Sequence, residues 1–248
     1  DVGERPQIDG RVDELFWEQA PAITDFLQQN PIESDPATEM TEVRVVYDDE
    51  ALYVSVRAFH SRPDQVVSRI MQRDRILEVD PFGRGELQQA GDDVFAILLD
   101  PFHDHRNGVV FATNPNGAEF EALITDEGSS VNIDWRGVWE VAGTRTPNGW
   151  SAEFAIPWRT LRYPDASGEE PWGINFFRGI RSKNEQVYWR SWEREGGGLQ
   201  RVSRAGHLSG LSDLPRQGLN VEAKPYGLLG RVQERNSADV LNGSVDRA

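Results

Sequence analysis

The sequence predicts a mainly β protein, an antiparallel, jelly-roll-like β-sandwich with short helices. Short apolar runs separated by Gly, Pro, Asn and Asp dominate the chain from residue 43 onward, whereas apolar residues at helical spacing are scarce. The 11 Phe, 8 Trp and 5 Tyr among 248 residues can fill a sizeable core, and the 23 Gly and 14 Pro suit the many turns of such a fold.

The predicted strands begin with a hairpin, because residues 43–47 alternate apolar and polar side chains and an acidic turn leads into residues 52–59. Residues 94–99 are apolar without a break and too few for a helix, so we expect a strand in the centre of a sheet. Turn signals at residues 107–108 and 114–117 predict a meander with two following strands. The later strands are 109–113, 118–124, 138–144, 150–156, 173–180 and 187–192.

Two short helices are predicted. Residues 13–19 would pack Leu15, Phe16 and Ala20 inward, and residues 157–161 start with a proline suited to a first turn. Residues 60–91 are rich in charge, Pro and Gly, which indicates a long excursion from the sheets. Four tryptophans lie among apolar neighbours and are predicted core residues: Trp17, Trp139, Trp150 and Trp172.

Composition bounds the domain organisation and the possible partners. We expect the sandwich over residues 1–212 and, because apolar residues then become sparse, an extended tail or the start of a further region over 213–248. The net charge is −15, and an acidic surface of that size repels phosphate, so nucleic acid is not expected as a partner. The absence of cysteine excludes thiolate metal sites, and no apolar run is long enough for a transmembrane helix.

Several ordered motifs resemble the family 9 carbohydrate-binding modules. They are residues 8–17 (IDGRVDELFW), 47–54 (YDDEALYV), 92–100 (DDVFAILLD), 114–117 (NPNG) and 150–158 (WSAEFAIPW). A closer resemblance is to a bacterial family of unassigned function, in which such a module precedes an outer-membrane β-barrel-like region. It is carried by residues 102–104, 106–108, 172–176 and 183–189, and residues 219–230 are similar to the first strand of that region.

The resemblance implies a non-catalytic binding module in the periplasm or at the cell surface, with a signal peptide removed and carbohydrate as the ligand. An alternative is a structural or interaction subunit of a larger membrane-associated protein complex without a sugar site. The Arg-rich stretch 178–204 favours that alternative, because such a charge pattern can orient a partner protein. A glycan-active enzyme is the third hypothesis.

A polar loop around Trp135 is the first candidate sugar site. An indole stacks on the C–H face of a sugar ring, while polar neighbours meet the hydroxyl groups. Those neighbours are Asn132, Asp134 and Arg136. Two interpretations stay open, namely that Trp135 contacts a sugar or that it folds over the end of a sheet.

A second candidate is the segment of Trp189, Arg190 and Trp192. A spacing of three residues on a strand places the two indoles on opposite faces, so we expect one in the core and the other exposed. The two loop tryptophans that clamp a sugar in family 9 modules do not map onto a motif here.

Calcium is the one expected cofactor, because carboxylate-rich loops offer oxygen ligands and family 9 relatives often bind it structurally. The candidate metal ligands are Asp92, Asp93, Asp100 and Asp104. No haem is expected.

Overall fold

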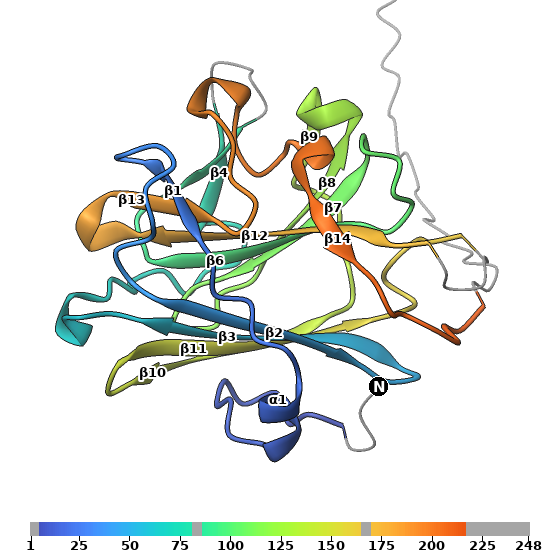
Figure 1. Ribbon diagram of the computed structural model, residues 1–248, viewed down its shortest axis with the longest axis horizontal. Helices are drawn as coiled ribbons and strands as arrows, with labels where there is room; N and C mark the ends of the chain where they lie inside the picture. Colours follow the sequence, from blue (N-terminus) through green and yellow to red (C-terminus); the bar gives the residue numbers. More distant parts are fainter. Residues whose placement is uncertain (1–4, 81–85, 165–169, 217–248) are drawn as a thin grey trace, which may run out of the picture. The chain divides into compact units, whose positions relative to one another are not determined.

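Two antiparallel sheets pack face to face in the computed structural model, which describes residues 5–80, 86–164 and 170–216 (Figure 1). The predicted sandwich is confirmed. The chain divides into two compact units, residues 1–217 and 218–248, and every described residue belongs to the first. That unit includes residues beyond the predicted boundary at 212, since Leu214 packs against the core and the Tyr163 hydroxyl donates to the carbonyl of Pro215 at 2.7 Å. The rest of the predicted tail lies outside the described residues.

The smaller of the two packed sheets has four strands in the order β10-β11-β3-β2. They are β2 (Thr41–Tyr47), β3 (Ala51–Phe59), β10 (Glu140–Thr146) and β11 (Gly149–Pro157). The larger has eight strands, seven in the order β1-β13-β12-β6-β7-β8-β9 with β14 paired to β12. They are β1 (Leu27–Asn30), β6 (Val94–Asp100), β7 (Gly108–Thr113), β8 (Phe120–Thr125), β9 (Ser130–Asn132), β12 (Trp172–Ile180), β13 (Glu185–Tyr188) and β14 (Gly206–Leu208).

The predicted central strand is confirmed, because β6 lies between β12 and β7 and all seven of its residues are buried. The meander is confirmed as β6, β7 and β8 in antiparallel pairs. The predicted hairpin is β2 and β3, which pair from Thr41 with Ala58 to Tyr47 with Leu52.

Three apolar layers hold the fold together. The largest lies between the two sheets, and alternation along β6 sends Phe95, Ile97 and Leu99 into it. The intervening residues of β6 enter a second layer on the outer face of the eight-stranded sheet. A third layer lies beneath the four-stranded sheet, where Figure 1 shows α1 (Leu15–Gln19). Trp17 of α1 and Tyr53 of β3 both belong to this layer.

The four predicted core tryptophans are all buried, but both predicted helices need correction. Only Leu15–Gln19 is helical, and Leu15, predicted to be buried, is 76% exposed because Trp17 occupies the inner face. In place of the helix predicted at residues 157–161, Pro157 ends β11 and residues 158–160 form a turn.

Two segments differ from the predicted strands and excursion. The predicted strand 187–192 ends at Tyr188. The excursion contains a hairpin, β4 (Leu77–Val79) with β5 (Leu87–Gln89), whose apolar residues cover the second layer. Short 3₁₀ turns complete the described elements: η1 (Pro63–Gln65), η2 (Asp126–Gly128), η3 (Arg181–Lys183), η4 (Arg194–Gly196) and η5 (Val202–Arg204). None of the described helices is long and apolar enough to cross a membrane.

Candidate functional site

Two adjoining hollows lie where β3 ends and β10 turns into β11. Hollow 1 has a volume of about 540 Å³ and is lined by Glu39, Met40, Phe59, His60, Ser61, Pro63, Pro147 and Asn148. Hollow 2, of about 430 Å³, is lined by Arg11, Val12, Asp13, Arg57, Ala58, Phe59, Thr146, Asn148, Trp150 and Ser151. Both hollows share Phe59 and Asn148, so one aromatic ring and one amide serve two neighbouring spaces.

The β10–β11 turn is held tightly against the end of β3. Gly149 pairs with Phe59, and the backbone N–H of His60 donates to the carbonyl of Asn148 at 2.8 Å. Gly149 has φ of 143°, and a Cβ there would lie 2.1 Å from the carbonyl oxygen of Ala58. Glycine is therefore required for the approach that places Asn148 beside Phe59.

Arg178 of β12 fixes the backbone of the same end from the opposite sheet. Its guanidinium donates to the carbonyls of Met40 at 2.9 Å and Phe59 at 2.6 Å, and to the Thr41 hydroxyl at 2.9 Å. The side chain is fully buried, and burial lowers the pKa of Arg178 to about 10. Burial also raises the pKa of nearby Asp93 to about 6. Arg178 thus positions the residues that line hollow 1.

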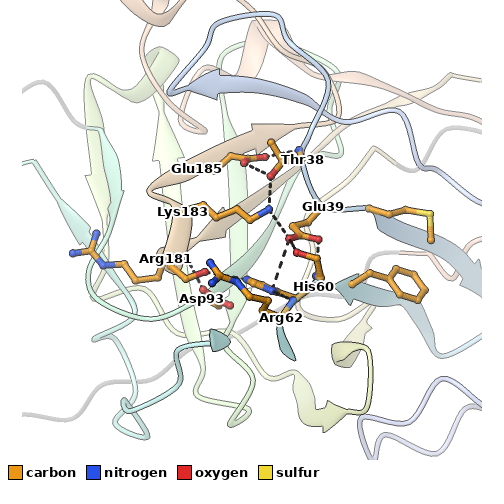
Figure 2. Close-up of polar contacts among 12 residues, drawn as sticks. Thr38, Glu39, His60, Arg62, Asp93, Arg181, Lys183 and Glu185 are labelled. Carbon is orange, nitrogen blue, oxygen red and sulfur yellow. Dashed lines mark hydrogen bonds and ion pairs between the residues drawn. The ribbon is translucent and has the colours of Figure 1, made fainter. Parts of the chain in front are cut away.

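A polar network borders hollow 1, and Figure 2 shows Lys183 between Thr38 and Glu39. The Lys183 ammonium lies 2.5 Å from a Glu39 carboxylate oxygen and donates to the Thr38 hydroxyl at 2.8 Å. Glu39 also accepts the N–H and the hydroxyl of Ser61. Burial by itself raises the pKa of Glu39, but the hydrogen bonds from Lys183 and Ser61 outweigh it and hold the pKa below its ordinary value. Glu39 is therefore a fixed anion.

Ser182, His60 and Glu39 superficially resemble a catalytic triad, but their hydrogen bonds oppose that role. The N–H of Arg62 donates to His60 Nδ1 at 3.0 Å, so in the neutral ring the proton sits on Nε2. That nitrogen lies 3.0 Å from the Ser182 hydroxyl and donates to it. Burial lowers the pKa of His60, which favours this neutral form. His60 cannot take the proton of Ser182, so these residues supply no activated nucleophile.

The predicted Trp135 loop lies at the other end of β10, a strand that spans roughly 20 Å at the usual rise per residue. Trp135 is half-buried, and its ring meets that of Phe111 edge-on at 6.0 Å, as expected for an indole folded over the end of a sheet. Arg136 forms an ion pair with Asp74 at 2.8 Å. The other predicted ligands of this loop are exposed: Asn132 and Asp134. Sugar binding by the loop stays a prediction.

The expectation for Trp189 and Trp192 is partly wrong. The two rings do pack on opposite faces of the eight-stranded sheet, but neither is exposed. Trp189 is half-buried and donates to Asp25 at 3.1 Å, and Trp192 is buried and donates to the carbonyl of Gly197 at 2.9 Å. Arg190 is exposed beside the Trp189 ring. Trp192 and Trp135 pack on opposite sides of the sheet, so they do not form one clamp.

The predicted metal ligands lie at opposite ends of β6. Asp92 and Asp93 directly precede its first residue, and their carboxylates accept backbone N–H groups, as does Asp100 at its end. Asp104 accepts the N–H groups of the next turn. Within the part of the chain that the structure describes, no three His, Asp or Glu side chains are arranged to hold a metal ion.

Calcium binding stays a prediction. If the native protein alone binds the ion, excess calcium raises the melting temperature by mass action, and magnesium does so less because it requires tighter octahedral geometry. Scanning calorimetry with calcium, magnesium or a chelator measures the difference. Identical melting curves in all three solutions would contradict calcium binding.

Sequence reasoning missed the residues that shape the two hollows. Phe59, Asn148 and Arg178 come from three distant segments, and no linear motif contains them. One signal was available, because Arg178 is the single charged residue within the apolar run 173–180. A charge at such a position is rarely buried unless it is paired or hydrogen-bonded.

Comparisons with known proteins agree with this geometry at the level of the fold. A model of the family described as "Carbohydrate family 9 binding domain-like" matches residues 8–197. Two solved structures of a family 9 carbohydrate-binding module from Caldicellulosiruptor kristjanssonii, in complex with glucose and with cellotriose, are 15% and 16% identical to this chain, with TM-scores of 0.51 and 0.52. They align with 89% and 88% of this chain and with 96% of their own. No curated protein matches.

Proposed function

Because the chain belongs to the carbohydrate family 9 binding domain-like family, we propose that it is a non-catalytic module that binds carbohydrate in hollows 1 and 2. The observation that carries the proposal is the pair of adjoining hollows that share Phe59 and Asn148. The half-exposed Phe59 ring offers an apolar face to the C–H groups of a sugar. The Asn148 amide beside it can both donate to and accept from sugar hydroxyls.

The rim of hollow 2 adds further partners for hydroxyl groups. Arg11 and Asp13 are exposed there, and no other described residue occupies their side-chain polar groups. Arg57 already forms an ion pair with Glu42 at 3.0 Å, so it contributes to the wall of the hollow rather than to ligand binding. An apolar platform with a few convergent polar groups is the usual composition of a small-molecule site.

The competing hypotheses receive less support. The Arg-rich stretch that favoured a partner protein is largely engaged within the fold. Arg178 is buried, Arg194 donates to the carbonyl of Gln29 and Arg201 donates to that of Gly196. At this end of the sandwich the proton on His60 Nε2 points to Ser182, so His60 does not act as a base that activates the serine. The proposal includes a periplasmic or cell-surface location, for which the resemblance of the sequence is the support.

Replacing Phe59 by alanine should weaken binding of the best ligand from a glycan array by about tenfold, because one stacked ring contributes on the order of 1–2 kcal/mol. Phe59 is half-exposed at the end of a strand, so the fold should persist. Isothermal titration calorimetry measures the affinity, and the melting temperature confirms folding.

Trp135→Ala is the matched control, because it also removes a half-buried aromatic ring. If the sugar binds in hollows 1 and 2, this substitution leaves the affinity unchanged. The reverse result, a loss with Trp135→Ala and none with Phe59→Ala, would move the sugar site to the Trp135 loop. An array without any bound glycan would contradict the proposed function itself.

A further inference from the structure

The N-terminal segment forms one wall of hollow 2. Residues 7–17, here called the N-terminal strap, run across the outer face of the four-stranded sheet and supply Arg11, Val12 and Asp13 to the hollow. Hydrogen bonds to β11 and β3 hold the strap in place. The Ser151 hydroxyl donates to the carbonyl of Gly10 at 2.6 Å, and Arg57 donates to that of Val12 at 2.5 Å.

Glu153 of β11 is the central attachment point of the strap. One of its carboxylate oxygens accepts the N–H groups of Asp9 at 3.2 Å and Gly10 at 3.0 Å, and the other accepts the indole N–H of Trp17 at 3.1 Å. Glu153 is fully buried. No described cation pairs with it.

The strap also carries a second carboxyl group, that of the partly buried Glu14. Glu14 accepts the N–H of Gln7 through one oxygen, while its other oxygen is buried and has no hydrogen-bond partner among the described residues. Burial first, and then the like charge of Glu14, raise the pKa of Glu153 to about 7.

The charged groups that β2 and β3 bring to this pair are already engaged, whereas Arg11 and Asp13 of the strap are exposed. On β2 and β3, Arg44 and Arg57 both pair with Glu42 and donate to strap carbonyls. Asp9 on the strap accepts the N–H of Arg11. The residues of β3 and β10 that pair with Glu153 are Ser55 and Ala142, which do not titrate.

We propose that the Glu14–Glu153 carboxyl pair is a proton-controlled latch that closes the N-terminal strap over hollow 2. A proton on Glu153 removes the charge from this buried carboxyl group while the strap stays in place. When Glu153 is ionised, its buried charge has no described cation and faces the like charge of Glu14, and release of the strap relieves that cost. The claim that strap release regulates sugar binding in hollow 2 rests on the proposed function. The claim that the strap is released as the pH rises does not.

The sign of the pH effect follows from the raised pKa of Glu153. A carboxyl group that binds its proton more tightly in the closed state stabilises closure fully below its ordinary pKa of 4.5. That stabilisation is lost as the pH rises through about 7. The strap should therefore be closed in acid and released above neutrality.

Hydrogen exchange of peptides covering residues 7–17, measured by mass spectrometry between pH 5 and 8 and corrected for intrinsic exchange, tests the latch. We expect protection to fall at least about tenfold over this range. Glu14→Gln removes the like charge but leaves Glu153 buried, so the fall should be clearly smaller than in the unmodified protein without disappearing. Glu18→Gln, an exposed change of the same charge on α1, should behave like the unmodified protein.

Constant protection in the unmodified protein, or an equal fall in Glu14→Gln, would overturn the proposal. The measurement needs no sugar, so failure of the latch and failure of the proposed function are distinguishable. With the best array ligand in hand, affinity should fall over the same pH range in the unmodified protein and less in Glu14→Gln. Equal falls in affinity would overturn the regulation of hollow 2.

Discussion

Replacing Arg178 by methionine should destabilise the protein by about 3–5 kcal/mol, the cost typical of removing one charged partner from a buried polar cluster. The change removes the guanidinium donor of the Phe59 carbonyl and leaves the Met40 carbonyl with the N–H of Phe59 alone. It also removes the positive charge near the buried Asp93. Methionine fills similar space, so a cavity contributes little. Urea unfolding followed by tryptophan fluorescence measures the loss.

Arg159→Met is the matched control, because Arg159 is exposed and no described residue bonds its guanidinium. A surface change of this kind should alter stability by no more than about 0.5 kcal/mol. Equal effects of the two substitutions would show that Arg178 does not join the two sheets as its hydrogen bonds indicate.

The fold was predictable because its signals are local. The unbroken apolar run 94–99 could only be a strand buried on both faces, and β6 is buried on both faces. The prediction of which helix residues are buried was wrong, because contacts with residues distant in sequence determine it. Leu15 was expected inside the fold, but the pocket beneath Tyr53 takes Trp17, which donates its indole N–H to Glu153 across 136 residues of chain.

The candidate site was harder to predict because it depends on register between distant strands. Phe59 looks like the last residue of an ordinary strand, and only the pairing of Gly149 with it brings Asn148 alongside. Trp135 was a predicted sugar ligand because its sequence neighbours are polar. The partner of its ring, Phe111, comes from another strand and cannot be found from that loop alone.

Replacing Gly149 by alanine should cost about 2 kcal/mol or more in stability and at least tenfold in affinity for the array ligand. The new Cβ would lie 2.1 Å from the carbonyl oxygen of Ala58 and 3.0 Å from the nitrogen of His60, both of them backbone atoms that cannot rotate aside. The φ of 143° is also unfavourable for alanine. The β10–β11 turn must therefore move away from β3, and Asn148 with it. Calorimetric melting and sugar titration measure the two effects.

Gly91→Ala controls for the added methyl group, because a Cβ at Gly91 meets nothing within 4 Å and should change neither quantity. The comparison with Phe59→Ala separates the effect of the shape of the hollows from the effect of ring stacking on the sugar. Phe59→Ala removes the ring and leaves the turn in place, whereas Gly149→Ala keeps the ring and displaces Asn148. If both hollows bind the sugar, each substitution weakens binding by a separate route. A Gly149→Ala protein that melts earlier but binds the ligand with unchanged affinity would show that the turn lies outside the sugar site.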